Sequence, residues 1–294
     1  MKRSSAMKIN SYAKINLGLE VLRKRTDGYH DLRTLFQTVD FFDVLEFSPA
    51  PQGKIEIRGD DPSIPWDEAN LIFKAASLLQ KNYRVSSGIL VTIRKKIPAG
   101  KGLGGGSSNA AMTLHALNNV WGLGLGKESL MELGRALGAD VPYFLEGGLC
   151  LGTGRGDRLV PLPDLPALPC LLVLPPFPIL TAEVYRRYRP SLTSAGKDSK
   201  IVRFLETREF GLLENNLEET IFSLSPQLRE IKSLFQSLGP ALSLVSGSGS
   251  AVFGLFLGEG QARHALGELG RTSGVLLVET LSREQYWKRV NAGV

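Results

Sequence analysis

Residues 97–111 read IPAGKGLGGGSSNAA, with five glycines among the first ten residues. The apolar stretch before them, residues 88–93, has the pattern of a strand, and residues 107–121 after them have that of an amphipathic helix. Glycine lets the backbone approach an anion closely, and a helix N-terminus adds partial positive charge. The order of strand, glycine loop and helix therefore predicts a phosphate-binding loop, with Ser107 or Ser108 as the helix N-cap.

Other glycine motifs fit this stretch less well. A Walker loop needs lysine followed by serine or threonine, whereas Lys101 is followed by glycine. The pattern G-x-G-x-x-G does match at Gly100, Gly102 and Gly105, but residues 94–98 separate it from its strand. No strand-ending acid follows about 20 residues later, so we interpret the match as chance. HRD and DFG segments are absent from the sequence, which excludes a protein-kinase glycine loop. The remaining alternative is a flexible linker, which rarely joins a strand to an amphipathic helix.

Composition sets further limits. The 294 residues are 43% hydrophobic and 22% charged, enough apolar material for one large domain or two ordinary ones. Two cysteines and three histidines without ligand spacing argue against a disulfide framework or a zinc site, and favour a cytoplasmic location. No apolar run reaches the roughly 20 residues that a membrane span needs. The net charge of +6 is dispersed, which favours a small phosphorylated ligand over nucleic acid, although it also suits an ordinary solvated surface.

Hydrophobic periodicity predicts a mixed fold. Residues 8–21 and 32–47 alternate as strands, and the polar segment 23–30 between them reads as a hairpin turn. Strands and helices follow without a strict βαβ rhythm, which favours the α+β class. Four prolines in residues 161–169 mark a boundary between predicted domains 1–160 and 161–294. The other predicted segments are strands at 54–58, 88–93, 171–174, 241–245, 251–257 and 275–280, and helices at 68–83, 107–121, 127–137, 182–188, 200–205 and 225–238.

Five segments resemble the GHMP kinases, the family of galactokinase, homoserine kinase, mevalonate kinase and phosphomevalonate kinase. PAGKGLGGGSSNAA resembles their second motif, P-x-x-x-G-L-G-S-S-A-A, in an extended form typical of a branch that phosphorylates a cytidine-diphosphate-linked methylerythritol. The others, in family order, are SYAKINLGLEV (11–21), RTDGYHDLRTLFQ (25–37), LGADVPYFLEGG (137–148) and LVSGSGSAVFGLF (244–256). Ser11 stands where the branch usually has proline, and residues 190–210 match no motif.

The resemblance implies a two-domain GHMP-kinase fold, in which an N-terminal α+β domain carries the glycine loop and a C-terminal domain is ferredoxin-like. It implies ATP and Mg²⁺ as cofactors and a small-molecule substrate. We expect no nucleic-acid or membrane partner, and a monomer or weak homodimer. Two alternatives stay open: another GHMP kinase acting on homoserine or a mevalonate, which the DGYH segment disfavours, and a basic nucleotide- or RNA-binding module.

The resemblance assigns Lys14 and Asp140 as the catalytic pair. Asp140 is expected to accept or orient the proton of the substrate hydroxyl, and Lys14 to stabilise the carboxylate and the developing charge. Position alone does not decide these roles: a lysine in such a strand is more often an edge-strand lysine facing water, and Asp140 also fits a helix N-cap.

The resemblance also suggests substrate contacts. Tyr29 would stack on the cytosine and His30 would bond its edge, while Tyr185, with Thr181 close by, would cover the other face. By position, Tyr29 and His30 could equally be exposed loop residues. Asn16 is predicted on the same side of its strand as Lys14, where it would contact the methylerythritol.

Two further sets complete the predicted site. Gly247, Ser248 and Gly249 are expected to bring a second backbone nest toward the substrate, or to form only a tight turn. The predicted ATP-binding residues are Pro98, Ala99, Gly100, Lys101, Gly102, Leu103, Gly104, Gly105, Gly106, Ser107, Ser108, Asn109, Asn70, Leu71 and Lys95, of which Leu71 could equally be helix core.

Overall fold

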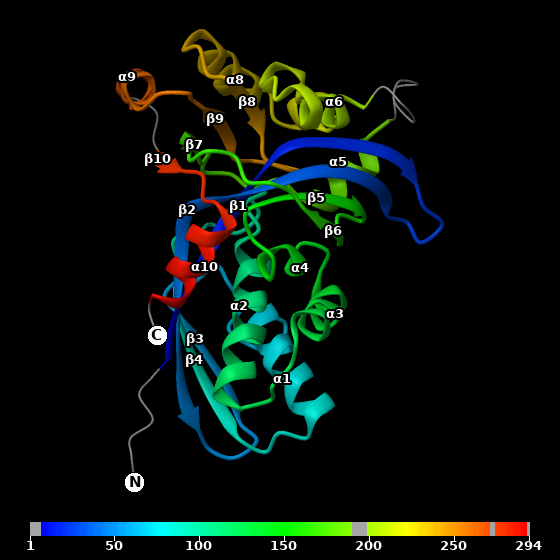
Figure 1. Ribbon diagram of the computed structural model, residues 1–294, viewed down its shortest axis with the longest axis vertical. Helices are drawn as coiled ribbons and strands as arrows, with labels where there is room; N and C mark the ends of the chain where they lie inside the picture. Colours follow the sequence, from blue (N-terminus) through cyan, green and yellow to red (C-terminus); the bar gives the residue numbers. More distant parts are fainter. Residues whose placement is uncertain (1–6, 190–198, 271–273, 293–294) are drawn as a thin grey trace.

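The computed structural model describes residues 7–189, 199–270 and 274–292. The outer limits of the predicted domains, residues 1 and 294, lie outside the described residues. So do residues 190–198 of the segment 190–210 that matched no motif. Two sheets organise the described chain, one of six strands and one of four. Figure 1 shows the long β1–β2 hairpin crossing the molecule, with helices α1–α4 on one side and the second sheet with its helices on the other.

The first sheet is built on one long hairpin. Its strands are β1 (Met7–Lys24), β2 (His30–Ala50), β3 (Ile55–Gly59), β4 (Gly88–Arg94), β5 (Leu149–Gly154) and β6 (Arg158–Pro161). β1 and β2 pair antiparallel from Met7 opposite Phe47 to Lys24 opposite His30. The other edge of β2 pairs with β4 near one end and with β5 near the other. The hairpin therefore links both halves of the sheet.

Four helices cover one face of this sheet. They are α1 (Leu71–Tyr83), α2 (Gly105–Val120), α3 (Lys127–Leu137) and α4 (Val141–Phe144). Leu79 of α1 and Leu114 of α2 are fully buried, in one apolar cluster with Val91 of β4. Burial of this kind contributes about 1.5–3 kcal/mol for each large side chain. It holds α2, and the glycine loop before it, against the sheet.

The second sheet is antiparallel in the order β10-β7-β9-β8. Its strands are β7 (Pro169–Val173), β8 (Leu242–Val245), β9 (Val252–Leu255) and β10 (Val275–Glu279). Leu171 faces helices α8 (Gln227–Ser237) and α9 (Glu259–Leu269), whereas its neighbour Leu172 belongs to the cluster shared with Leu17 and Leu35 of the hairpin. This alternation packs the second sheet onto the β1–β2 hairpin. The junction between the two sheets is where the predicted site residues meet.

The remaining elements are α5 (Thr181–Arg187), α6 (Lys200–Thr207), the 3₁₀ turn η1 (Phe210–Leu212), α7 (Glu218–Leu224) and α10 (Arg283–Asn291). β6 belongs to the first sheet and β7 to the second, whereas Tyr286 and Val290 of α10 are buried in the core of the first sheet. The boundary at residue 160 remains a prediction, and we propose that residues 281–292 belong spatially to the N-terminal unit.

The α+β class is confirmed, and every strand and helix predicted from the pattern is present.

The predicted N-cap is wrong. Helix α2 begins at Gly105, its N-cap is Gly104 at φ 72°, and no side chain caps it. Ser108 lies inside the helix, where its hydroxyl accepts a hydrogen bond from Ser11 Oγ at 2.7 Å. Seven elements were missed: the short strands β5 and β6, the four-residue helix α4, the 3₁₀ turn η1, and the helices α7, α9 and α10.

Candidate active site

Lys14 occupies the centre of the β1–β2 hairpin, on its face toward the sheet junction. The residue is only 3% exposed. Its ammonium donates to Asn16 Oδ1 at 2.5 Å and lies 5.4 Å from the centroid of the Phe36 ring. The backbone N–H of Lys14 donates to the carbonyl of Leu103 at 3.0 Å, so the glycine loop covers this edge of the strand. Lys14 is therefore a buried cation and not a solvent-facing edge lysine.

Burial dominates the electrostatics of Lys14. It lowers the pKa of the ammonium below its usual 10.5, and the nearby carboxylate of Asp140 raises it only in part. The ion pair between Lys14 Nζ and Asp140 Oδ2 spans 3.5 Å. A charge held in so little water interacts strongly with any anion that enters the site.

Asp140 comes directly before α4, at the N-cap position, but its carboxylate makes no capping hydrogen bond. Its side chain is 34% exposed and points toward Lys14. Lys14 and Asp140 are paired and Asp140 does not act as a side-chain cap, and their role as the catalytic pair stays a prediction. A carboxylate beside a buried ammonium, open to a cavity, can accept a proton from a bound hydroxyl.

The glycine loop contacts this pair with backbone. Gly102 and Gly104 have φ of 73° and 72°. A Cβ at Gly104 would lie 2.7 Å from the Phe144 ring and 3.3 Å from Lys14 Cε, and one at Gly102 would lie 2.0 Å from the Ser246 carbonyl. Only glycine fits at these two positions, because the side-chain space is already filled.

The N-terminus of α2 is the part of the loop that is open. Gly106 is exposed, and a Cβ there would find only Leu71 Cδ1, at 3.9 Å. The first backbone N–H groups of a helix lack intrahelical partners, and this helix has no side-chain cap. The N-termini of helices with free N–H groups bind anions.

Lys101 does not face this opening. Its ammonium donates to the carbonyls of Pro175 at 2.6 Å and Phe177 at 2.5 Å, and burial lowers its pKa. The side chain thus ties the loop to the segment that precedes α5. Two of the three ammonium donors of Lys101 are thus used within the protein, and a contact of this residue with the nucleotide stays a prediction. Pro98 is half-buried, and Ala99 and Gly100 form the exposed rim of the loop.

The side chains of Lys95, Ser108 and Asn109 belong to a buried polar network around Asp43 and Ser11. Asp43, which is fully buried, accepts from Lys95 Nζ at 2.5 Å and from Asn109 Nδ2 at 2.9 Å. Asn109 Nδ2 also donates to Ser11 Oγ at 2.9 Å. The serine that replaces the usual proline is therefore part of this network. These side chains anchor the first turn of α2 from behind, which sequence position did not reveal.

Two positions expected near the nucleotide belong to the start of α1. Asn70 is its N-cap, with Oδ1 accepting from the Ile72 N–H at 2.9 Å. Leu71 packs at the edge of the first core and is the nearest side chain to Gly106. Both therefore lie beside the α2 N-terminus.

The second glycine turn faces Lys14 and Asn16 from the other sheet. A Cβ at Gly247 would lie 3.0 Å from Asn16 Oδ1 and 3.5 Å from Lys14 Nζ. The hydroxyl of Ser248 bonds that of Thr181, at the start of α5, at 2.7 Å. Gly249 faces the apolar side chains of Val245 and Ile179 instead.

A cavity of about 340 Å³ joins these groups. Eleven of the predicted residues line it: Lys14, Asn16, Tyr29, His30, Gly102, Gly104, Asp140, Thr181, Tyr185, Gly247 and Ser248. Residues from positions 14 to 248 thus converge on one hollow at the sheet junction. Its volume suits a small organic ligand and is far too small for a polymer.

Aromatic rings form one end of the cavity. The His30 ring stacks on Tyr185 with centroids 5.4 Å apart and an interplanar angle of 28°. Burial, and secondarily Lys24, lower the pKa of His30, which favours a neutral imidazole. Tyr29 is 56% exposed, and its ring lies 5.3 Å from the guanidinium carbon of Arg155. Tyr29 thus has a free face, whereas Tyr185 is covered by His30.

Arg155 and Phe36 also line the cavity and were missed by sequence analysis. Arg155 lies between β5 and β6, where Asp157 holds its guanidinium at 2.7 Å. A lone arginine in an unrecognised hairpin carries no signal in the sequence. Phe36 belongs to the RTDGYHDLRTLFQ segment, but the alternation of the strand predicts that its side chain packs in the core.

Comparison with known proteins agrees with this geometry. The model of the GHMP kinases N terminal domain matches residues 70–148, and that of the GHMP kinases C terminal domain matches residues 203–274. A 4-diphosphocytidyl-2-C-methyl-D-erythritol kinase of Syntrophus aciditrophicus is 44% identical over 90% of this chain and 95% of its own length. The protein of the same name from Pelotomaculum thermopropionicum is 40% identical over 90% and 94%.

Solved structures show the same relationship. A crystal structure of 4-(cytidine 5'-diphospho)-2C-methyl-D-erythritol kinase superposes with a TM-score of 0.80 at 37% identity, covering 93% of this chain and 99% of that one. Homoserine kinase from Cytophaga hutchinsonii, at 19% identity and a TM-score of 0.74, shares the fold. The predicted two-domain fold is confirmed, and the chain belongs to the GHMP kinase family, in the branch of the 4-diphosphocytidyl-2-C-methyl-D-erythritol kinases.

Proposed function

We propose that this protein transfers the γ-phosphoryl group of ATP to a hydroxyl of 4-diphosphocytidyl-2-C-methyl-D-erythritol, giving the 2-phosphate in the non-mevalonate isoprenoid pathway. The observation that most directly supports this function is the Lys14–Asp140 ion pair. Its charged atoms lie 3.5 Å apart in a cavity whose other end is lined by Tyr29 and His30. The names of relatives that share 90% of the chain support the same substrate.

In this proposal the reacting hydroxyl lies between Asp140 and the α2 N-terminus. Asp140 accepts or orients its proton, and Lys14 stabilises the negative charge that develops on the oxygens. Asn16 holds the ammonium of Lys14 and lines the same cavity, where we expect it to contact the methylerythritol. Phosphoryl transfer needs mainly such positioning and charge stabilisation.

The residues around α2 fit a nucleotide triphosphate. Gly106 leaves open the space that a Cβ would occupy, and the N–H groups beside it have no side-chain cap. ATP supplies the phosphoryl group, and Mg²⁺, held mainly by phosphates and waters, offsets their charge. Asn70 and Leu71 stand where the adenine end of the nucleotide would lie.

We further propose a cytoplasmic enzyme that acts as a monomer or weak homodimer and has no nucleic-acid partner. The dispersed charge and the small cavity support a small-molecule substrate. Within the described residues, no helix combines the length and apolarity that a membrane crossing requires.

A coupled ADP-release assay tests the function. The purified protein should release ADP with the cytidylated methylerythritol, and homoserine and mevalonate should give background rates. Turnover of either control at a comparable rate would favour another GHMP specificity. Salt-sensitive RNA binding without ATP turnover would favour a nucleotide-binding module.

In the same assay, Asp140→Asn keeps the size of the side chain and removes the base. We expect kcat to fall by about 10²-fold or more. Near-normal turnover by a folded variant would remove Asp140 from its proposed role.

Gly106→Ala tests the phosphate position. Alanine is a better helix former than glycine, so the melting temperature should stay the same or rise slightly. The added methyl group should block the backbone donors, raising KM for ATP by roughly tenfold or more. Gly260→Ala, at the equivalent second position of α9 with open space around it, is the matched control. It should have the same small effect on the melting temperature and leave KM for ATP unchanged.

Tyr29→Leu tests the cytosine position. Loss of one stacking face should raise KM for the cytidylated substrate roughly 5- to 100-fold and leave KM for ATP unchanged. Tyr83→Leu, a similarly exposed tyrosine at the end of α1, should have no effect. An unchanged substrate KM in Tyr29→Leu would place the base elsewhere.

The lowered pKa of Lys14 predicts opposite pH trends for activity and stability. kcat/KM should fall on the alkaline side at a pH below 10.5, because the neutral amine no longer stabilises charge. Between the lowered pKa and 10.5 the unfolded chain binds more protons than the native chain, so the stability of wild type relative to Lys14→Met should rise with pH. pH–rate profiles and thermal melts measure the two trends. In Lys14→Arg the alkaline decrease of kcat/KM should disappear, because arginine stays protonated. If the decrease persists in this variant, another group causes it.

A further inference from the structure

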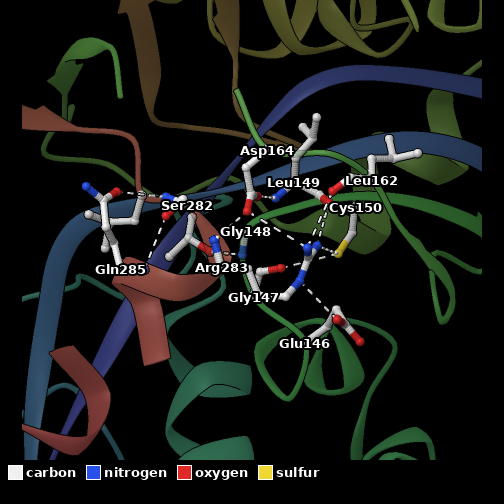
Figure 2. Close-up of polar contacts among 12 residues, drawn as sticks. Glu146, Gly147, Gly148, Leu149, Cys150, Leu162, Asp164, Ser282, Arg283 and Gln285 are labelled. Carbon is white, nitrogen blue, oxygen red and sulfur yellow. Dashed lines mark hydrogen bonds and ion pairs between the residues drawn. The ribbon is translucent and has the colours of Figure 1, made fainter. Parts of the chain in front are cut away.

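Helix α10 packs against the turn that follows α4, although the contacting residues Tyr286 and Phe144 are 142 positions apart in the chain. Figure 2 shows Arg283, at the start of α10, with its guanidinium directed into the backbone around Glu146, Leu149 and Leu162. Helix α4 is only four residues long and begins directly after Asp140. The structure around this turn therefore bears on where Asp140 lies.

Two side chains of α10 bind the open carbonyls at the end of α4. Tyr286, fully buried, donates its hydroxyl to the carbonyl of Phe144 at 2.6 Å. Trp287 Nε1 donates to the carbonyl of Glu146 at 3.0 Å. The last carbonyls of a helix have no intrahelical donors, so these two bonds replace what a longer helix or water would supply.

Arg283 fixes the residues that come next. Its guanidinium lies 3.0 Å from Glu146 Oε1 and donates to the carbonyl of Leu149 at 2.9 Å. Its backbone N–H donates to Asp164 Oδ2 at 2.8 Å, and Asp164 Oδ1 accepts from the Leu149 N–H at 2.9 Å. These bonds, drawn in Figure 2, hold both sides of the turn.

Two glycines let the turn press directly on α10. Gly147 has φ 75°, and a Cβ there would lie 2.2 Å from the Tyr286 ring. Gly148 has φ 68°, and its Cβ would lie 2.5 Å from Asp164 Oδ1. Backbone atoms of the turn therefore pack directly against their neighbours in and around α10. This close packing leaves little freedom for the turn to shift.

The carboxylate of Asp140 makes no capping bond and its pairing with Lys14 spans 3.5 Å, so the position of Asp140 rests on the backbone of α4. We propose that α10, together with the helices that pack on α4, positions Asp140, with Tyr286, Trp287 and Arg283 as positioning residues that act through that backbone. The proposal rests on the proposed function, in which Asp140 is the proton acceptor. Displacement of a reacting group by 1 Å can cost about 10²-fold in rate.

The test combines two conservative variants with a double-mutant cycle. Tyr286→Phe removes only the hydroxyl, whereas Trp287→Phe removes the indole N–H donor together with part of the ring; both keep an aromatic ring in the core. Each should lower kcat by about tenfold, a fraction of the effect of a 1 Å displacement, with KM for ATP and for the cytidylated methylerythritol unchanged. In the Asp140→Asn background, Tyr286→Phe should cause no further loss, because the group it positions is already disabled.

Arg289→Met is the matched control. Arg289 lies on the same helix but pairs with Asp40 and Glu279, away from α4. The Arg289→Met variant should lower the melting temperature without changing kcat. It therefore distinguishes a general loosening of α10 from a displacement of Asp140.

Three results would overturn the proposal: an unchanged kcat in both aromatic variants, an equal kcat loss in Arg289→Met, or a full additional loss in the Asp140→Asn background. Absence of turnover by the wild-type protein would instead reject the proposed substrate, so the two failures are distinguishable.

Discussion

The rest of the site depends on one buried charge, the ammonium of Lys14. A cation almost without water must be held by polar partners, or it loses its proton. Asn16 binds it directly, Asp140 lies 3.5 Å away, and the Gly247 turn approaches it from the second sheet. The two sheets, packed together through the β1–β2 hairpin, exclude water from this point, and the same exclusion strengthens its attraction for phosphate.

Glycine makes that convergence possible. Around Lys14, the loop at Gly102–Gly104 and the turn at Gly247 contribute backbone where side chains would collide with Ser246, Phe144 or Asn16. The same residue type serves a different purpose at Gly106, where the neighbouring space is open. One glycine-rich run therefore contains positions needed for packing and a position available to a ligand, and only the surrounding structure separates them.

The surrounding structure also decides what the polar side chains near the loop do. Lys101, Lys95, Ser108 and Asn109 all stand in or beside the phosphate motif, yet their side chains anchor the loop from behind, through Asp43, Ser11 and the carbonyls before α5. A loop whose donors must meet an anion without reorganising needs such anchoring. The motif thus encodes the rigidity of the loop as much as its contacts with a ligand. Helix α10 gives corresponding support to the turn that follows α4.

The sequence by itself determined the α+β class, the hairpin, the strand–glycine loop–helix order and the shared face of Lys14 and Asn16, because these follow from periodicity and backbone freedom over short distances. The resemblance of five segments placed the chain in its family. Tertiary structure decided which members of the motif face the cavity, that Arg155 joins Tyr29, that Ser11 takes part in the loop network, and that α10 returns to the first core. These features join residues as far apart as 144 and 286, and local patterns carry no information about such contacts.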